Sequence, residues 1–274
     1  MCIWATRARY RELRGIYSPS LPLFWKLDAQ RSSFDIIYYM NKKPVIGIVS
    51  KPSKFDDEEL FKSQVIYEPV RCAVLKNGGL PIGILPTQAT QSFYEDEIEI
   101  DKTILSDEEL NDLHNIVDRC DGVILQGGLS SASYEYAVAK YAIEKNIPLL
   151  GICAGFNNIV RAMGGDVFLG DNISRHNIED CSIAHRIIIK EGSVLHGILG
   201  EIEADVNSIH IFFAKEEDIN GLEISAYSDD GFVEAVELKD RRFCLGVKWH
   251  PELMLDDIKM KRIFEEFIKV CGNC

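Results

Sequence analysis

From residue 44 onward, short apolar runs alternate with segments whose apolar residues recur at helical spacing. The first run, residues 44–50 (PVIGIVS), is apolar along almost its whole length, as a strand buried on both faces would be. A helix-like segment over 65–77 follows and ends at Gly78-Gly79, a typical helix C-terminus. Strands joined by helices through short connections form parallel sheets with right-handed crossovers. The pattern therefore predicts an α/β fold with an open, mostly parallel sheet flanked by helices.

The rest of the chain extends this order. Further strands are expected at 80–85, 122–126 and 147–152, and helices at 106–119, 134–146 and 156–163. An acidic stretch at 87–107 interrupts the alternation and is expected to be a surface excursion with a solvated face at 95–101. The later strand-like runs predict an added antiparallel section, followed by a closing helix: 183–189, 222–228, 232–238 and 243–249, then 256–270.

The first 39 residues differ in composition from everything that follows. They carry six basic and three acidic residues, a net charge of +3, whereas residues 40–274 carry a net charge of −16. We therefore place a boundary at Met40, with a catalytic domain over 40–274 and an N-terminal extension over 1–39 that is disordered or results from a misplaced start. Gly15 and Pro19 interrupt the apolar core that a secretory signal needs. An organelle transit peptide and a membrane-surface helix are weaker alternatives.

Composition excludes several classes of protein. The chain has 274 residues and a net charge of −13, which argues against a nucleic-acid partner, and it is long enough to bury a large core. No run approaches the roughly 18 apolar residues of a membrane span, so no membrane partner is expected. Eight scattered cysteines suggest reduced thiols and hence a cytoplasmic location. The CxxC spacing of Cys271 and Cys274 lacks the second pair that a zinc site usually needs.

Residues 148–155 (PLLGICAG) place one nucleophile, Cys153, between an apolar strand and an apparent helix. A sharp strand-to-helix turn exposes a single side chain, and small flanking residues relieve the crowding there. The helix N-terminus would stabilise a thiolate and lower the cysteine pKa. A buried structural cysteine at a strand end is the alternative.

A second strand, 243–249, runs directly into His250, with Glu252 two residues later. Residues i and i+2 of an extended segment face the same side, and the residue before a proline favours extended geometry. Glu252 can therefore orient His250, which would accept the thiol proton of Cys153. Taken alone, His-Pro-Glu is more often a solvated loop.

Gln126-Gly127-Gly128 ends the strand expected before the one that carries Cys153. Ligand sites of open parallel sheets lie at the carboxyl ends of the strands. Paired glycines let backbone N–H groups approach a developing oxyanion, next to the N–H of Ala154. A plain tight turn is the alternative.

These motifs, in this order with Val206-Asn-Ser-x-His210, resemble class I glutamine amidotransferase domains. The sequence is most similar to their gamma-glutamyl hydrolase branch, peptidase C26, which includes gamma-glutamyl-gamma-aminobutyrate hydrolases. The resemblance covers residues 44–270 and includes the stretch 230–237 (DGFVEAVE). It implies the flavodoxin-like fold of class I glutamine amidotransferases, with an antiparallel section added to the parallel sheet.

The resemblance also implies roles for individual residues. Cys153 would be the nucleophile, His250 the general acid and base, and Glu252 its orienting carboxylate. The backbone amides of Gly128 and Ala154 would form the oxyanion hole. Further residues would contact substrate, namely Gly127, Asn157, Asn207, Ser208 and His210. The implied reaction is hydrolysis of a small-molecule gamma-glutamyl amide through a glutamyl thioester, which needs no metal or organic cofactor; a homodimer is left open.

The chain departs from the family pattern near the site. Asn157 stands where the family usually has Gln, and Ala154 where a basic residue or Leu is common. Ile211 follows His210 where a basic residue or a second histidine is usual, and the acidic residue after the glycine pair is absent. These changes leave the three catalytic residues in place, put the identity of the released amine in doubt and predict a more apolar pocket.

Three alternatives to a free-standing hydrolase remain. A glutaminase subunit would deliver ammonia to a separate synthetase, and an inactive binding homologue would explain the departures at Ala154, Asn157 and Ile211. A cysteine-type α/β-hydrolase also has a Gly-x-Cys-x-Gly turn, but its acidic residue precedes the histidine. The remaining histidines are expected to be structural or solvated, and His176 and His185 are expected to lie too far apart to share a metal ion.

Overall fold

Residues 42–54, 62–88, 104–128, 131–170, 175–178 and 182–273 are described by the structure, a computed structural model. The chain divides into two units after Lys42, and the fold below is that of the second unit, Lys43–Cys274. The extension 1–39 and the acidic tract 95–101 lie outside the described residues, as do Leu129, Ser130, Cys181 and Cys274. The boundary at Met40 therefore stays a prediction.

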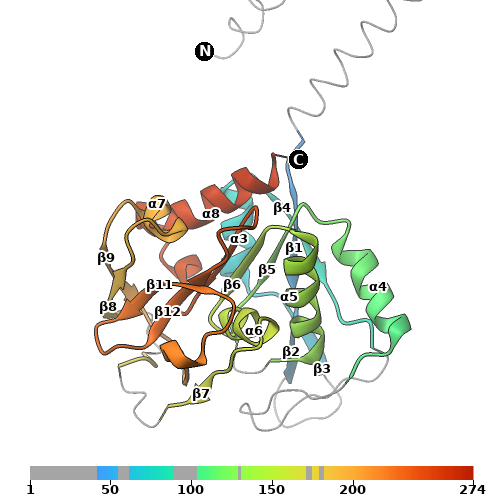
Figure 1. The fold of residues 1–274 in the computed structure, drawn as a ribbon. Coiled ribbons are helices and arrows are strands. Elements are labelled where there is room, and N and C mark those ends of the chain that lie inside the picture. Colours follow the sequence, from blue (N-terminus) through green and yellow to red (C-terminus); the bar gives the residue numbers. More distant parts are fainter. Residues whose placement is uncertain are drawn as a thin grey trace, which may run out of the picture. The chain divides into compact units, whose positions relative to one another are not determined.

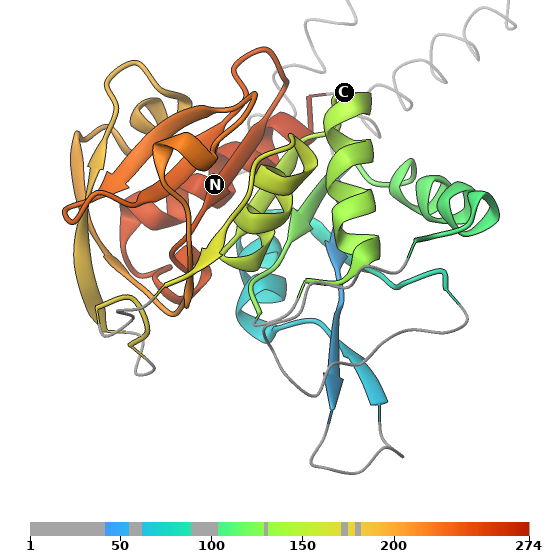
Figure 2. The same cartoon turned by 60° about the horizontal axis from the view of Figure 1, so that its bottom comes forward.

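A sheet of nine strands, counted over the described residues, runs in the order β4-β1-β5-β6-β13-β12-β11-β8-β9. The first five of these strands pair in parallel. Their bounds are β4 Leu80–Ile84, β1 Val45–Val49, β5 Gly122–Leu125, β6 Leu149–Ile152 and β13 Cys244–Val247. Because they are parallel, their carboxyl ends meet at one edge of the sheet, at the bottom of Figure 1 and turned toward the viewer in Figure 2.

The other four strands continue the same sheet with antiparallel pairing, as expected. They are β12 Val233–Glu237, β11 Glu223–Ser228, β8 Ile183–Ile189 and β9 Glu203–Asn207. β13 forms the junction, since it pairs in parallel with β6 on one side and antiparallel with β12 on the other. The predicted mostly parallel sheet with an antiparallel section is thus confirmed.

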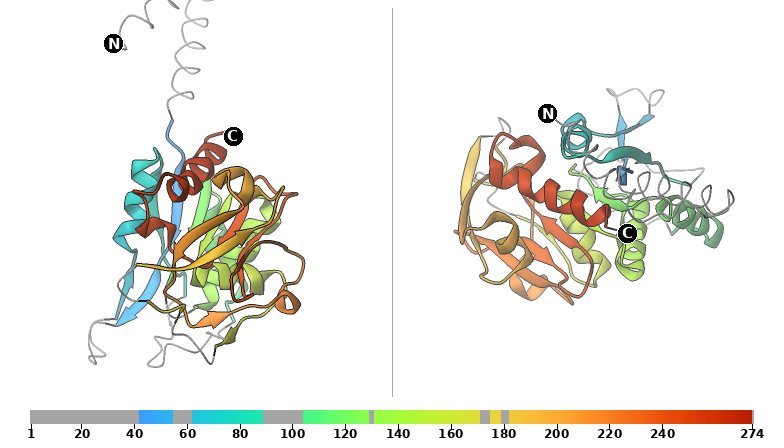
Figure 3. Two further views of the ribbon diagram at one scale, coloured as in Figure 1. Left: turned by 90° about the vertical axis from the view of Figure 1, so that its left-hand side faces the viewer. Right: turned by 90° about the horizontal axis from the view of Figure 1, so that it is seen from above.

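Helices cover both faces of the sheet and bury two apolar clusters (Figure 3). On one face lie α3 Glu68–Lys76, α7 Val194–Leu199 and α8 Ile258–Cys271, and on the other α4 Asp107–Val117, α5 Ser133–Lys145 and α6 Ala154–Ala162. The capping signal expected before α4 is present, since the Ser106 hydroxyl accepts from the Glu109 N–H and the Glu109 carboxylate accepts from the Ser106 N–H. No helix in the described part of the chain is long and apolar enough to cross a membrane.

Some short elements differ from the sequence expectation. The helix expected from residue 65 begins at Glu68, because Val65 ends strand β3 and Pro69 occupies the first helical turn. Strand β3 pairs with β2, and two further short strands pair outside the main sheet; the bounds are β2 Lys51–Lys54, β3 Lys62–Val65, β7 Phe168–Leu169 and β10 Phe212–Phe213. Two 3₁₀ turns, η2 Glu216–Asp218 and η3 Pro251–Leu253, complete the described elements.

Candidate active site

Cys153 lies in the sharp turn between β6 and α6. Its backbone has φ 52° and ψ −100°, a conformation that non-glycine residues rarely adopt. Two glycines make the turn sterically feasible. A Cβ on Gly155 would lie 2.1 Å from the main-chain oxygen of Leu125, and one on Gly151 would lie 2.6 Å from the Gly155 oxygen. The predicted strand-to-helix elbow is therefore present, and it holds the thiol at the carboxyl edge of the sheet.

His250 follows β13 and lies beside its carboxylate partner. The Nδ1–H of His250 donates to Glu252 Oε1 at 2.7 Å. The sequence predicted that the two side chains meet because they share one side of an extended segment, and this geometry is wrong. Residues 251–253 form a 3₁₀ turn, which places the Glu252 carboxylate next to the His250 ring. With Nδ1 occupied, Nε2 is the nitrogen left to exchange a proton with a thiol.

Asn207, the last residue of β9, fixes the main chain of His250. Its Oδ1 accepts from the His250 N–H at 2.8 Å, and its Nδ2 donates to the His250 carbonyl at 3.0 Å. The side chain is fully buried. Both of its polar atoms thus bind the backbone of His250, so Asn207 positions this residue, and its assignment as a substrate contact stays a prediction.

The surroundings of Cys153 favour its charged form. Burial acts to raise the pKa of the thiol, but other groups outweigh it and lower the pKa to about 7. These are the positive charge of His250, the ammonium of Lys248 and the backbone N–H of Gly128. The thiol itself donates to the Ile209 carbonyl at 3.7 Å. Burial acts to lower the pKa of His250, yet Glu252 and Cys153 raise it well above its ordinary value. The arrangement favours a thiolate–imidazolium pair.

Lys248 was not recognised from the sequence, where a lysine at a strand end is typical of a solvated position. It is fully buried two residues before His250. Its Nζ donates to Asn157 Oδ1 at 2.9 Å and lies 5.2 Å from the centre of the Phe156 ring. Burial lowers its pKa. Its positive charge acts on the thiol from inside the protein, where screening by water is weak.

The glycine pair after β5, Gly127 and Gly128, lies next to the residues described above. A Cβ on Gly127 would lie 2.5 Å from Cε1 of His250, so only glycine leaves room for the imidazole. Gly128 has φ +144°, and its N–H is one of the groups that act on the sulfur. The aliphatic chain of Lys51 packs against Gly128, while its Nζ pairs with the buried Glu135 at 2.6 Å. Gly128 is therefore where an oxyanion donor is expected, and Ala154 is the first residue of α6.

The other expected substrate contacts have interior partners. Asn157 is buried and bonded to Lys248, and the Ser208 hydroxyl donates to the main-chain oxygen of His176 at 2.9 Å. His210 is buried, and its Nδ1–H donates to the Phe212 carbonyl at 2.9 Å. Their assignment as substrate contacts remains a prediction.

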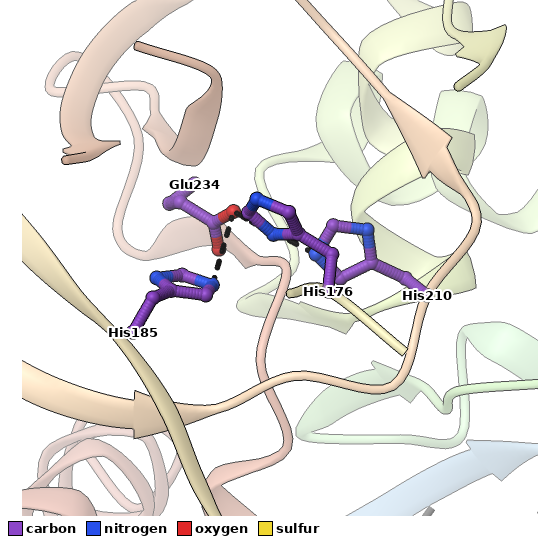
Figure 4. Close-up of side chains that lie close together, drawn as sticks. All are labelled: His176, His185, His210 and Glu234. Carbon is purple, nitrogen blue, oxygen red and sulfur yellow. Dashed lines mark ion pairs between the residues drawn. The ribbon is translucent and has the colours of Figure 1, made fainter. Parts of the chain in front are cut away.

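His176 and His185 lie side by side, with ring centres 4.5 Å apart. The expectation that they lie too far apart to share a metal ion is wrong, because antiparallel pairing brings together segments distant along the chain. His210 and Glu234 complete a buried group with them (Figure 4). Glu234 was missed as a member of this group, and its only sequence signal was a carboxylate inside an apolar strand.

His114, by contrast, stacks on Tyr141 with ring centres 3.7 Å apart, in line with a structural role.

Comparison with solved structures agrees with this fold. The glutaminase domain of a Trypanosoma brucei CTP synthase, with bound acivicin, superposes with a TM-score of 0.57 at 18% identity, covering 83% of this chain and 93% of that one. At such low identity the likeness concerns the fold alone.

Relatives by sequence include a gamma-glutamyl-gamma-aminobutyrate hydrolase and a CTP synthase. The Escherichia coli gamma-glutamyl-gamma-aminobutyrate hydrolase PuuD is 30% identical over 263 residues, covering 84% of this chain and 94% of the relative. A CTP synthase of Sulfurisphaera tokodaii is 28% identical over 184 residues, with only 34% of its length matched. The family model of Peptidase C26 matches residues 44–252. The chain belongs to the Peptidase C26 family and has the class I glutamine amidotransferase fold.

Proposed function

We propose that this protein hydrolyses a gamma-glutamyl amide bond, in a substrate similar to gamma-glutamyl-gamma-aminobutyrate. The observation that carries the proposal is the arrangement of Cys153, His250 and Glu252 at the carboxyl edge of the sheet, with the pKa of the thiol lowered to about 7. The similarity to PuuD along most of both chains supports the substrate class.

In the proposed reaction, Cys153 Sγ bonds to the gamma-carbonyl carbon and the carbonyl oxygen takes up negative charge. The backbone N–H groups of Gly128 and Ala154 would stabilise that oxyanion. The tetrahedral intermediate collapses as the C–N bond breaks, and the imidazolium of His250 gives its proton to the leaving amine. Water then attacks the glutamyl thioester and gives a proton to His250. Cleavage of the C–S bond releases glutamate and restores the thiolate of Cys153 beside the imidazolium of His250.

Each supporting residue has a defined part in this scheme. Glu252 keeps His250 in the tautomer that presents Nε2, and Asn207 holds the backbone on which the ring is mounted. Lys248 stabilises the thiolate by its charge, without contacting substrate. The scheme needs no group other than the amino acid side chains, main-chain amides and water.

The test is release of glutamate from a panel of gamma-glutamyl amides and peptides. The Cys153→Ala variant should lose at least about 10³-fold in kcat/KM. Intact-mass analysis with acivicin should show one adduct on the wild-type protein and none on this variant. Cys72→Ala is the matched control, because Cys72 is a more exposed thiol whose pKa is raised, and it should label and turn over normally. Equal labelling of the wild-type protein and Cys153→Ala would refute the proposal.

A glutaminase subunit is the second candidate, and the match to part of a CTP synthase favours it. Such a subunit would be nearly silent on gamma-glutamyl amides alone and would gain activity only with a synthetase partner. Turnover by the isolated chain on gamma-glutamyl-gamma-aminobutyrate, faster than on glutamine, would exclude it. No adduct and no turnover on any substrate would favour an inactive binding homologue.

A further inference from the structure

Four buried side chains, His176, His185, His210 and Glu234, gather in the antiparallel section of the sheet. One ring nitrogen of each histidine and one carboxylate oxygen lie within 4.8 Å of one another. Exposed fractions are 1%, 4%, 4% and 0% of the residues, respectively, so water does not solvate the group. Figure 4 shows the three rings arranged around the carboxylate.

Hydrogen bonds set the tautomers of two of the histidines. The Nδ1 of His185 lies 3.3 Å from the Arg186 carbonyl, and that of His210 lies 2.9 Å from the Phe212 carbonyl. A carbonyl only accepts, so each Nδ1 carries the proton and each Nε2 keeps its lone pair. Those two Nε2 atoms lie 3.7 and 3.6 Å from Glu234 Oε1.

His176 carries its proton on Nε2 instead of Nδ1, and it also turns an unprotonated nitrogen toward Glu234. Its Nε2 lies 3.1 Å from Asp230 Oδ2, and Asp230 is itself held by the Ser228 hydroxyl at 2.6 Å. The carboxylate accepts, so Nδ1 is left with the lone pair, 3.7 Å from Glu234 Oε1. The Ser208 hydroxyl lies 3.5 Å from this Nδ1 but directs its hydrogen to the His176 carbonyl at 2.9 Å. All three histidines therefore direct an unprotonated nitrogen at one carboxylate.

This arrangement leaves its acceptor atoms unsatisfied unless a proton or a metal ion lies among them. Distances of 3.6–3.7 Å are too long for hydrogen bonds, and lone pairs repel a carboxylate. Within the described part of the chain, the Nε2 atoms of His185 and His210 and both oxygens of Glu234 have no hydrogen-bond partner. Lys248, the nearby cation named above, donates to Asn157 instead. Four buried acceptors that face one point form a ligand set.

The surroundings are those of a structural metal centre. Phe213 and Phe232 pack edge-on against the His176 ring, at 4.9 and 5.9 Å between ring centres, and keep the group dry. Each histidine is held from behind by a carbonyl or a carboxylate, the usual second layer of support for metal-bound imidazole.

We propose that His176 Nδ1, His185 Nε2, His210 Nε2 and Glu234 Oε1 bind one zinc ion. Three imidazoles and a carboxylate in a buried four-point arrangement suit Zn²⁺, whose ligand atoms lie about 3.4 Å apart when each bond is about 2.1 Å. The separations from Glu234 Oε1, 3.6–3.7 Å, need to shorten by a few tenths of an ångström, and the longest separations in the group, up to 4.8 Å, by about 1.4 Å. Four protein ligands close the coordination shell, so the ion would tie β8 and β12 to the segments that carry His176 and His210. This role is separate from the proposed hydrolysis.

The first test measures metal content and stability of the whole chain. Protein produced with zinc in the medium and purified without chelators should contain about one zinc ion per chain, measured by inductively coupled plasma mass spectrometry. Chelator-treated protein should unfold at a lower temperature. Zinc at about 1,000 times Kd should then raise the unfolding temperature by about 10 °C. Cobalt substitution should give tetrahedral absorption bands without the charge-transfer band of a thiolate ligand.

Variants assign the site. Glu234→Gln and His185→Gln should weaken zinc binding by at least about 100-fold, and Asp230→Asn by about 10-fold. His114→Gln is the matched control, a histidine stacked on Tyr141 outside the group, and should bind zinc normally. Cys153→Ala should also keep one zinc, which separates this site from metal bound at the reactive thiol.

Several outcomes would overturn the proposal. They are a wild-type chain with less than about 0.1 zinc that gains no thermal stability from added zinc, unchanged binding in Glu234→Gln and His185→Gln, or loss of the zinc in Cys153→Ala. The wild-type measurements decide the question even if the ligand variants fail to fold, because metal content and the zinc-dependent shift in unfolding temperature need no substitution.

Discussion

At the scale of single residues, the most consequential feature is the charge state of Cys153. With its pKa lowered to about 7 and that of His250 raised, the thiolate–imidazolium pair should persist between the two values. The rate of Cys153 alkylation should therefore rise through about pH 7, not through the value of about 8.5 for a free cysteine. The kcat/KM for hydrolysis should show its acid limb at the same pH and fall again when His250 loses its proton.

Glu252→Gln tests the origin of this shift. Without the carboxylate, the pKa of His250 falls, its positive charge acts less on the thiol, and the pKa of Cys153 rises. The acid limb should then move up by about one pH unit. Alkylation followed by mass spectrometry across pH reads this directly, and an unmoved limb would contradict the assigned role of Glu252.

Asn207 offers a second prediction at this scale. Asn207→Ala removes both hydrogen bonds to the His250 backbone and should lower kcat by about 10- to 100-fold with little change in KM. Asn158→Ala is the control, since Asn158 is a buried amide of α6 that has no partner for its side-chain atoms among the described residues. Steady-state kinetics of both variants separates the effects. Equal kcat values in Asn207→Ala and Asn158→Ala would show that the two hydrogen bonds from Asn207 to the His250 backbone are dispensable.

At the scale of elements, the elbow between β6 and α6 depends on close approach of main chains. Gly155→Ala would place a methyl group 2.1 Å from the Leu125 carbonyl oxygen, so the helix or β5 must shift. We expect a loss of about 2–4 kcal/mol in the free energy of unfolding, together with a loss of activity.

Gly197→Ala is the matched control for that substitution. Gly197 lies within α7, and nothing lies within 4 Å of the Cβ that alanine would add. Alanine should be neutral or stabilise by up to about 1 kcal/mol, since it favours helix. Denaturant unfolding of the two variants provides the measurement, and similar losses in both would show that helical context, not the contact with Leu125, sets the cost.

How well elements could be predicted from the sequence depended on their burial. Four of the parallel strands, β1, β5, β6 and β13, are buried along almost their whole length, so each appears as a continuous apolar run. The residues of the elbow and of His250–Glu252 stand at the ends of such runs. The hairpin of β2 and β3 could not be recognised because its strands, KPSK and KSQV, are polar and lie outside the main sheet.

The parts of the site that escaped prediction depend on long-range pairing. His176, His185, His210 and Glu234 come from four separate segments, and no spacing along the chain indicates that antiparallel pairing makes them neighbours. Lys248 could not be recognised because its burial is fixed by α6, on which Asn157 and Phe156 lie.

At the scale of the whole molecule, the described elements begin at Val45 and end at Cys271. We expect a chain that starts at Met40 to fold and turn over like the full-length chain, with kcat/KM within about two-fold and an unchanged unfolding temperature. Side-by-side kinetics and thermal unfolding of the two chains check this. A large loss in either would show that residues 1–39 contribute to the fold.

The position of β13 has a consequence for the order in which reactivity arises during synthesis. The strand that enters the sheet between β6 and β12 comes last along the chain, and it brings Lys248 and His250 to a thiol translated about a hundred residues earlier. A nascent chain that has completed only its first parallel strands thus holds Cys153 beside neither cation, with the pKa of an ordinary buried thiol. If Cys153 is the nucleophile of the proposed hydrolysis, its thiol would become reactive only after β13 has joined the sheet, so an unfinished chain would carry no activated sulfur.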